Sequence, residues 1–99
     1  MTEEETNKLQ ERKKLNHKEY ERLREASKDY EYLLDGEKDI LLKDLYYEHL
    51  LTQEEINFLE GKEESEYSNK LLEELKGYRN ILETLASEKK CDITKKLEI

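Results

Sequence analysis

The residue types and spacing that come closest to a chemical site are those of Asp44, Glu48 and His49. On a helix, two carboxylates four residues apart share a face. An imidazole beside them could transfer a proton or bind a metal. However, neither His49 nor His17 belongs to an H-x-x-x-H or E-x-x-H pattern of a metal-binding helix. Because the chain has 26 acidic residues among 99, we attribute the cluster to coincidence and predict no catalytic residue and no metal site.

The remaining reactive groups are equally isolated. Three separate glycines form no phosphate-binding loop. Cys91 has only Lys89 and Lys90 beside it, which is typical of an incidental thiol. A single cysteine also rules out an intrachain disulfide and favours a reducing compartment. The sequence therefore predicts a protein that is not an enzyme and needs no cofactor.

Composition favours long helices and a protein partner. The chain is 44% charged and 34% hydrophobic, with no proline, so almost nothing interrupts a helix. The net charge is −8, and residues 36–66 alone carry ten acidic and three basic groups. Such a surface would repel nucleic acid and differs from the basic helices of membrane surfaces. Without a signal peptide or an apolar run of ~20 residues, we expect a cytoplasmic protein, with co-export beside a partner left open.

The first helix is predicted over about residues 5–34. A stripe of mostly apolar residues follows three- and four-residue steps along it, as in a weak heptad pattern: Leu9, Asn16, Tyr20, Leu23, Tyr30 and Leu34. Asp35-Gly36 is its expected break, since glycine commonly ends helices. A second helical segment then covers residues 37–51.

The chain is expected to reverse near residues 51–53. Thr52 and Glu55 fit a capping box, in which each side chain accepts from the other's backbone N–H. Further helices follow over about 53–60 and 63–90, and residues 91–99 form a frayed tail. The last helix has the cleanest seam, with leucines and a tyrosine spaced 4-3-4-3: Leu71, Leu75, Tyr78, Leu82 and Leu85.

Folding about residue 52 places residue i opposite roughly residue 104 − i. In that register the apolar part of the first helix faces the leucine-rich seam of the last helix. We therefore predict one all-α domain over residues 1–99, an elongated antiparallel helical hairpin. A 30-residue helix is ~45 Å long, so the shape should be a rod.

Residues 40–59 do not fit one stripe, because their apolar side chains occupy three helical faces. Ile40, Tyr47 and Leu51 share one face, and the others divide between two more. One partner helix cannot cover all three. The surplus forms either a local core or a docking surface, the latter for a second copy or another helical protein. For docking we predict four anchors inside an acidic rim: Leu42, Tyr46, Leu50 and Phe58.

The layout resembles the small helical-hairpin helpers of Gram-positive type VII secretion, particularly those associated with LXG toxins. The resemblance covers the whole chain: a charged first helix, an apolar middle, a Leu-rich last helix and a Lys/Glu-rich end. It lacks the W-x-G turn and the Y-x-x-x-[DE] export pattern of WxG-like proteins. The resemblance implies an adaptor or chaperone that binds the helical N-terminal domain of a toxin and targets it for secretion.

Two other classes stay open. An acidic phage-type inhibitor could mimic DNA with six carboxylates, those of Glu54, Glu55, Glu60, Glu63, Glu64 and Glu66. The long helices predicted for this chain, however, are nearly neutral, whereas a DNA mimic needs negative charge along an extended surface. A bacteriocin immunity protein is the other alternative, since these are also small and helical.

Overall fold

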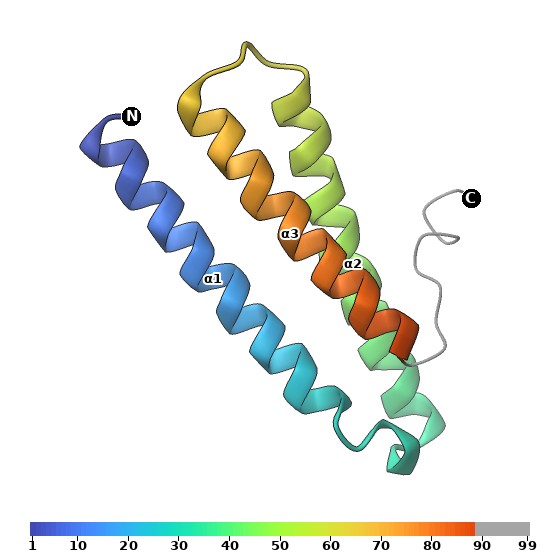
Figure 1. Ribbon diagram of the computed structural model, residues 1–99. Helices are drawn as coiled ribbons and strands as arrows, with labels where there is room; N and C mark the ends of the chain where they lie inside the picture. The colour runs from blue at the N-terminus through green and yellow to red at the C-terminus, as the bar shows by residue number, and fades with distance from the viewer. Residues whose placement is uncertain (89–99) are drawn as a thin grey trace.

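The computed structural model describes residues 1–88, which form three helices and a short turn (Figure 1). They are α1 (Glu3–Ser27), the 3₁₀ turn η1 (Tyr30–Tyr32), α2 (Asp35–Glu60) and α3 (Glu66–Glu88). α1 and α3 run in the same direction, and α2 runs antiparallel to both. The extents are 47 × 28 × 17 Å and the radius of gyration is 15.0 Å, against ~13 Å for a compact chain of this length. The predicted all-α class and elongated shape are confirmed.

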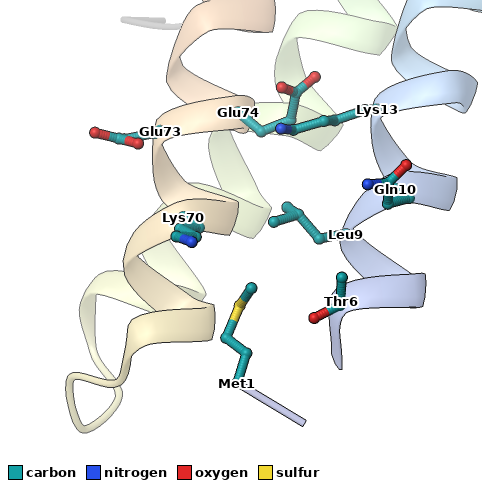
Figure 2. Close-up of a pocket in the computed structure, with 8 residues that line it drawn as sticks. All are labelled: Met1, Thr6, Leu9, Gln10, Lys13, Lys70, Glu73 and Glu74. Carbon is teal, nitrogen blue, oxygen red and sulfur yellow. The ribbon is translucent and has the colours of Figure 1, made fainter. Parts of the chain in front are cut away.

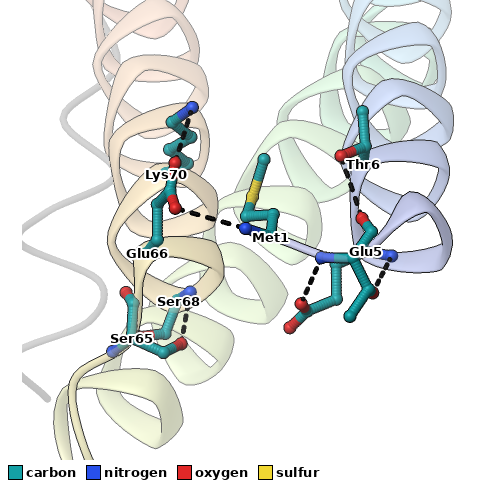
Figure 3. Close-up of polar contacts among 8 residues, drawn as sticks. Met1, Glu5, Thr6, Ser65, Glu66, Ser68 and Lys70 are labelled. Carbon is teal, nitrogen blue, oxygen red and sulfur yellow. Dashed lines mark hydrogen bonds and ion pairs between the residues drawn. The ribbon is translucent and has the colours of Figure 1, made fainter.

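Capping side chains begin both outer helices (Figure 3). At α1, the Thr2 hydroxyl accepts from the Glu5 N–H at 3.1 Å, and the Glu5 carboxylate accepts from the Thr2 N–H at 3.0 Å. At α3, the Ser65 N–H donates to Ser68 Oγ and the Ser68 N–H donates back to Ser65 Oγ. These reciprocal bonds satisfy backbone donors that have no partner inside the helix.

α1 ends at Ser27, so the prediction of one helix over 5–34 is wrong beyond that residue. η1 and an extended Leu33 turn the chain back, and Tyr30 and Leu33 pack against the core. Leu34, expected in the buried stripe, is 72% exposed. Asp35-Gly36 therefore begins the next helix instead of ending the first.

α2 is continuous through residues 51–53, and the predicted reversal there is wrong. Thr52 is buried in mid-helix, where its hydroxyl donates to the Glu48 carbonyl at 2.8 Å instead of capping. The segments predicted as 37–51 and 53–60 are thus one helix. The chain reverses instead after Gly61, the C-cap of α2. A continuous buried face along α2 outweighs a local capping motif, whose contribution is only about 1 kcal/mol.

The first and last helices are parallel, so the predicted register of i against 104 − i is also wrong. Asn16 Nδ2 donates to Glu74 Oε1 at 3.3 Å, and the Met1 ammonium lies 3.2 Å from Glu66. The antiparallel helical hairpin is formed by α2 and α3, with α1 alongside (Figure 1).

The core lies where the three helices meet. A cluster of buried residues there contains members of all three helices: Leu23, Leu41, Leu45, Tyr78, Leu82 and Leu85. The predicted α3 seam is confirmed, since four of its five residues are buried and Leu71 is partly buried. The predicted helix end at residue 90 and the tail 91–99 lie outside the described residues.

Candidate protein-binding surface

α2 has a sharply defined buried face. Its buried side chains follow steps of three and four residues and include two polar ones: Leu41, Leu45, His49, Thr52 and Ile56. At about 100° per residue they fall within an arc of about 80°. This face packs against α1 and α3, so the remaining arc decides what α2 presents to solvent.

Four large apolar side chains form an exposed row on the other side of α2. They are Ile40, 69% exposed, Tyr47, 58%, Leu51, 38%, and Phe58, 62%. Their spacing of seven, four and seven residues places them within an arc of about 40°, roughly 140° from the centre of the buried face. The row is ~27 Å long at ~1.5 Å per residue. We call these four residues the α2 stripe.

The four predicted anchors are divided by the structure. Leu42 packs against the core, Tyr46 and Leu50 are partly buried at the edge of α2, and Phe58 belongs to the α2 stripe. Helical periodicity already placed Ile40, Tyr47 and Leu51 on one face. What it could not show was which of three apolar faces α1 and α3 leave uncovered.

Charged groups border the α2 stripe along both edges. Lys43 and Glu54 lie about 50° to one side, which we call the first edge. Asp44 and Glu55 lie about 50° to the other side, the second edge. Lys43 pairs with Asp39 at 2.9 Å within the same helix. At the C-terminal end the Lys62 ammonium lies 4.2 Å from the centroid of the Phe58 ring, a cation–π contact.

Arginines of α1 pair with the second edge. Arg22 Nη1 donates to Asp44 Oδ2 at 2.8 Å, and Arg12 Nη2 donates to Glu55 Oε1 at 2.9 Å. Hydrogen bonds to Asp44 and then to Glu19 raise the pKa of Arg22 above its ordinary value. Both carboxylates on this edge are thus paired within the chain, which reduces the acidity of the predicted rim.

A groove meets the α2 stripe at Ile40. It lies between α1 and α2 and has a volume of about 470 Å³. Four aliphatic and three charged residues line it: Ala26, Leu33, Ile40, Leu41, Arg22, Glu37 and Asp44. Its walls are mainly aliphatic, and the Arg22–Asp44 pair borders it. The groove extends the apolar surface from α2 towards α1.

The cluster of Asp44, Glu48 and His49 does not converge on one point. Asp44 binds Arg22, Glu48 accepts from the Tyr78 hydroxyl at 3.1 Å, and His49 Nε2 lies 2.9 Å from Glu83 Oε1. Within residues 1–88 no three His, Cys, Asp or Glu side chains are grouped so that they could hold a metal ion. These residues link helices.

Two buried side chains of this cluster's contacts, His49 and Tyr78, are each held by a carboxylate of another helix. His49 is 1% exposed, and its Nδ1 has no hydrogen-bond partner. A neutral ring with the proton on Nε2 leaves only an acceptor unsatisfied and lets Nε2–H donate to Glu83. Burial, and then Glu48, raise the pKa of Tyr78 above its ordinary value of 10.0.

A second hollow lies between the N-terminal ends of α1 and α3 (Figure 2). It has a volume of about 420 Å³, and its lining mixes both charges: Met1, Thr6, Leu9, Gln10, Lys13, Lys70, Glu73 and Glu74. Lys13 extends towards Glu74 across the opening in Figure 2, while Glu73 points away. This mixture provides no convergent set of donors or acceptors for a ligand.

Half of the six carboxylates considered for DNA mimicry have cationic partners. Glu55 pairs with Arg12, Glu60 with Lys76 at 3.3 Å, and Glu66 with both Lys70 and the N-terminus. Hydrogen bonds from the N-terminus and Lys70 lower the pKa of Glu66. This pairing reduces the exposed negative charge that a mimic would need.

Comparisons with protein-family models, with curated proteins and with solved structures return no significant match for this chain. None of the three described helices is long and apolar enough to cross a membrane.

Proposed function

We propose that this protein is a non-enzymatic helical adaptor that binds a helix of another protein along the α2 stripe. The observation that carries the proposal is the stripe itself, a row of four large, exposed apolar side chains on one side of α2, in a chain that is 44% charged. Exposed apolar surface that gathers on one face of a protein generally marks an interaction site.

The shape of the stripe favours a helical partner. A straight row ~27 Å long matches about five turns of a helix. An amphipathic helix can present apolar side chains to such a row at its own three- and four-residue spacing. Aromatic side chains such as Tyr47 and Phe58 are common binding hot spots because they contribute large contact areas at low entropic cost.

A narrower proposal names the partner. If the type VII helper resemblance holds, the helix on the α2 stripe belongs to the N-terminal domain of a secreted toxin, and the adaptor targets that toxin for export. The layout of the sequence supports this proposal. Co-expression with the product of an adjacent toxin gene tests it: a stable complex is expected from the wild type, and separate elution of the two proteins would contradict it.

Site-specific photo-crosslinking tests the general proposal. A benzophenone amino acid replaces Tyr47 in one variant and Tyr32, 87% exposed in the turn after α1, in a matched aromatic control. In the source cells, the probe at position 47 should give discrete adducts with a protein other than a second copy of this chain, and the control should not. Adding Leu51→Lys should abolish them.

A second variant pair separates binding from folding. Tyr47→Lys with Leu51→Lys changes the stripe, whereas Leu15→Lys with Ile81→Lys changes two similarly exposed residues on α1 and α3. Both variants should retain wild-type helicity by circular dichroism, and only the first should lose its partner. Identical adducts at positions 47 and 32, or none at 47, would refute use of the stripe.

A further inference from the structure

The α2 stripe is symmetric about the level of His49. Ile40 and Phe58 lie nine residues from it on either side, and Tyr47 and Leu51 lie two residues from it. In a two-fold interface, residue i of one copy contacts residue j of the other and residue j contacts residue i. The symmetry of the α2 stripe therefore lets each of its apolar side chains meet another apolar side chain in an antiparallel pair.

We propose that a second copy of this chain occupies the α2 stripe, with the two α2 helices antiparallel about a two-fold axis level with His49. This inference rests on the proposed use of the stripe for binding. Ile40 then meets the second copy's Phe58, and Tyr47 meets the second copy's Leu51. Each aromatic ring packs against a branched aliphatic side chain, four such contacts in all.

Charges on the first edge fit the antiparallel arrangement. In an antiparallel pair equal edges face each other, so Lys43 comes within one residue of the level of the second copy's Glu54. Symmetry makes this contact twice. Both side chains are exposed, and Lys43 has only an exposed partner, Asp39, within its own helix. Their rearrangement in the dimer therefore disrupts no buried contact.

The second edge is compatible with the same arrangement. It places Asp44 within one residue of the level of the second copy's Glu55, two carboxylates that would repel each other if unpaired. Both are already paired with arginines of α1, at 2.8 and 2.9 Å. The arginines offset this repulsion, and they do so in each copy.

A parallel pair fits less well. Opposite edges would then meet, which places the exposed Glu54 beside the second copy's Glu55, and Lys43 beside an Asp44 whose charge Arg22 already pairs. The antiparallel pair places Lys43 beside the second copy's exposed Glu54 instead. It also aligns the helix dipoles favourably.

The interface is small. Four side chains from each copy along ~27 Å of helix bury an area near the lower limit of specific interfaces, about 1,200 Å² in total. We therefore expect a reversible dimer that dissociates in the micromolar range. A partner with a longer helix could displace the second copy.

Charge reversal tests the register. Sedimentation equilibrium from about 1 µM to 1 mM should show that Lys43→Glu or Glu54→Lys weakens the dimer about tenfold, because symmetry doubles each change. The double reversal should restore affinity to within about threefold of the wild type. In a parallel dimer Glu54→Lys would instead strengthen association, which would overturn the proposal.

Disulfide trapping tests the orientation in a Cys91→Ser background. Ile40→Cys and Phe58→Cys chains, mixed and oxidised, should form the mixed 40–58 disulfide, since such bonds need Cα atoms within about 7 Å. Ile40→Cys alone should not cross-link, because its two copies lie ~27 Å apart along the antiparallel pair. A 40–40 disulfide would indicate parallel helices and refute the inference.

Failure of this inference differs from failure of the proposed function. A wild-type chain that stays monomeric to 1 mM, or a dimer that persists in the variant with Tyr47→Lys and Leu51→Lys, overturns the second-copy inference. The adaptor proposal would then still stand on the photo-crosslinks at position 47. Absence of those crosslinks refutes the adaptor proposal itself.

Discussion

Replacing Gln53 by proline distinguishes a continuous α2 from a chain reversal. At a reversal capped by Thr52, Gln53 would be the first helical residue, where proline is favoured because its missing N–H has no helical partner anyway. In the structure, Gln53 lies in the middle of a 26-residue helix. Its N–H there donates to the His49 carbonyl in the regular helical pattern, and the proline ring would collide with that carbonyl.

The expected cost follows from these contacts. Interior proline destabilises a helix by ~3 kcal/mol or more. The substitution also removes the side-chain bonds of Gln53, which accepts from Arg79 Nη1 at 3.0 Å and donates to Asn57 Oδ1 at 3.0 Å. Each contributes about 1 kcal/mol. Against a total stability of ~5–15 kcal/mol for a domain of this size, Gln53→Pro should come close to unfolding the protein.

Two controls isolate the backbone effect. Gln53→Ala removes the side-chain bonds alone and should cost about 1–2 kcal/mol. Asp35→Pro places proline at the true first residue of α2, after an extended Leu34 that suits it, and should stay within about 1 kcal/mol of the wild type. Urea unfolding followed at 222 nm measures all three. If Gln53→Pro unfolds at the same urea concentration as Asp35→Pro, α2 is interrupted at Thr52 and the three-helix arrangement is wrong.

Three further predictions use the same unfolding assay. Leu75→Ala should cost ~2–5 kcal/mol, because Leu75 is fully buried, whereas Glu73→Ala on the exposed side of α3 should stay within about ±0.5 kcal/mol; equal effects would mean that the phase of α3 is misassigned. Glu83→Ala should cost ~1–3 kcal/mol despite the partial exposure of Glu83, since it leaves buried His49 without its partner; a neutral result would show that His49 needs none. The folded state raises the pKa of Tyr78 above 10.0, so the stability that the neutral phenol contributes is complete below pH 10 and is lost as the pH rises through the folded-state pKa. Above pH 10 the free energy of unfolding of Tyr78→Phe should therefore decrease less steeply with pH than that of the wild type. Parallel plots of unfolding free energy against pH would contradict the raised pKa of Tyr78.

The sequence was sufficient for α3 and for most of the α1 stripe. The 4-3-4-3 spacing in α3 allows only one buried face, whatever the neighbouring helices do. In α1, Leu9, Asn16 and Leu23 recur every seven residues and are buried as expected. Asn16 is polar yet buried because Arg12 and Glu74 satisfy its amide.

The reversals were harder to predict because local and long-range signals conflict. By sequence, Thr52 and Glu55 form a clearer helix-capping motif than any residues at 28–34 or 61–65, the two segments where the chain reverses. Yet a continuous α2 that passes straight through Thr52 buries Leu41, Leu45 and Ile56 together on one face. Burial of large aliphatic side chains stabilises by ~1.5–3 kcal/mol each, which exceeds one helix cap.

The exposure of the α2 stripe is a consequence of the burial of Leu41, Leu45 and Ile56. Rotating α2 to bury Tyr47 and Phe58 would expose Leu41, Leu45 and Ile56, so the described fold keeps the aliphatic residues inside and leaves the aromatic ones in water. His49 and Thr52 enter the core with them because they share that face, and each has a hydrogen bond there. A helix that buries two polar residues while it exposes four large apolar ones is not optimal for an isolated chain, since each exposed Å² of apolar surface forgoes about 25 cal/mol. That unfavourable exposure is relieved when another helix covers the stripe, which is the physical reason for placing the binding surface there.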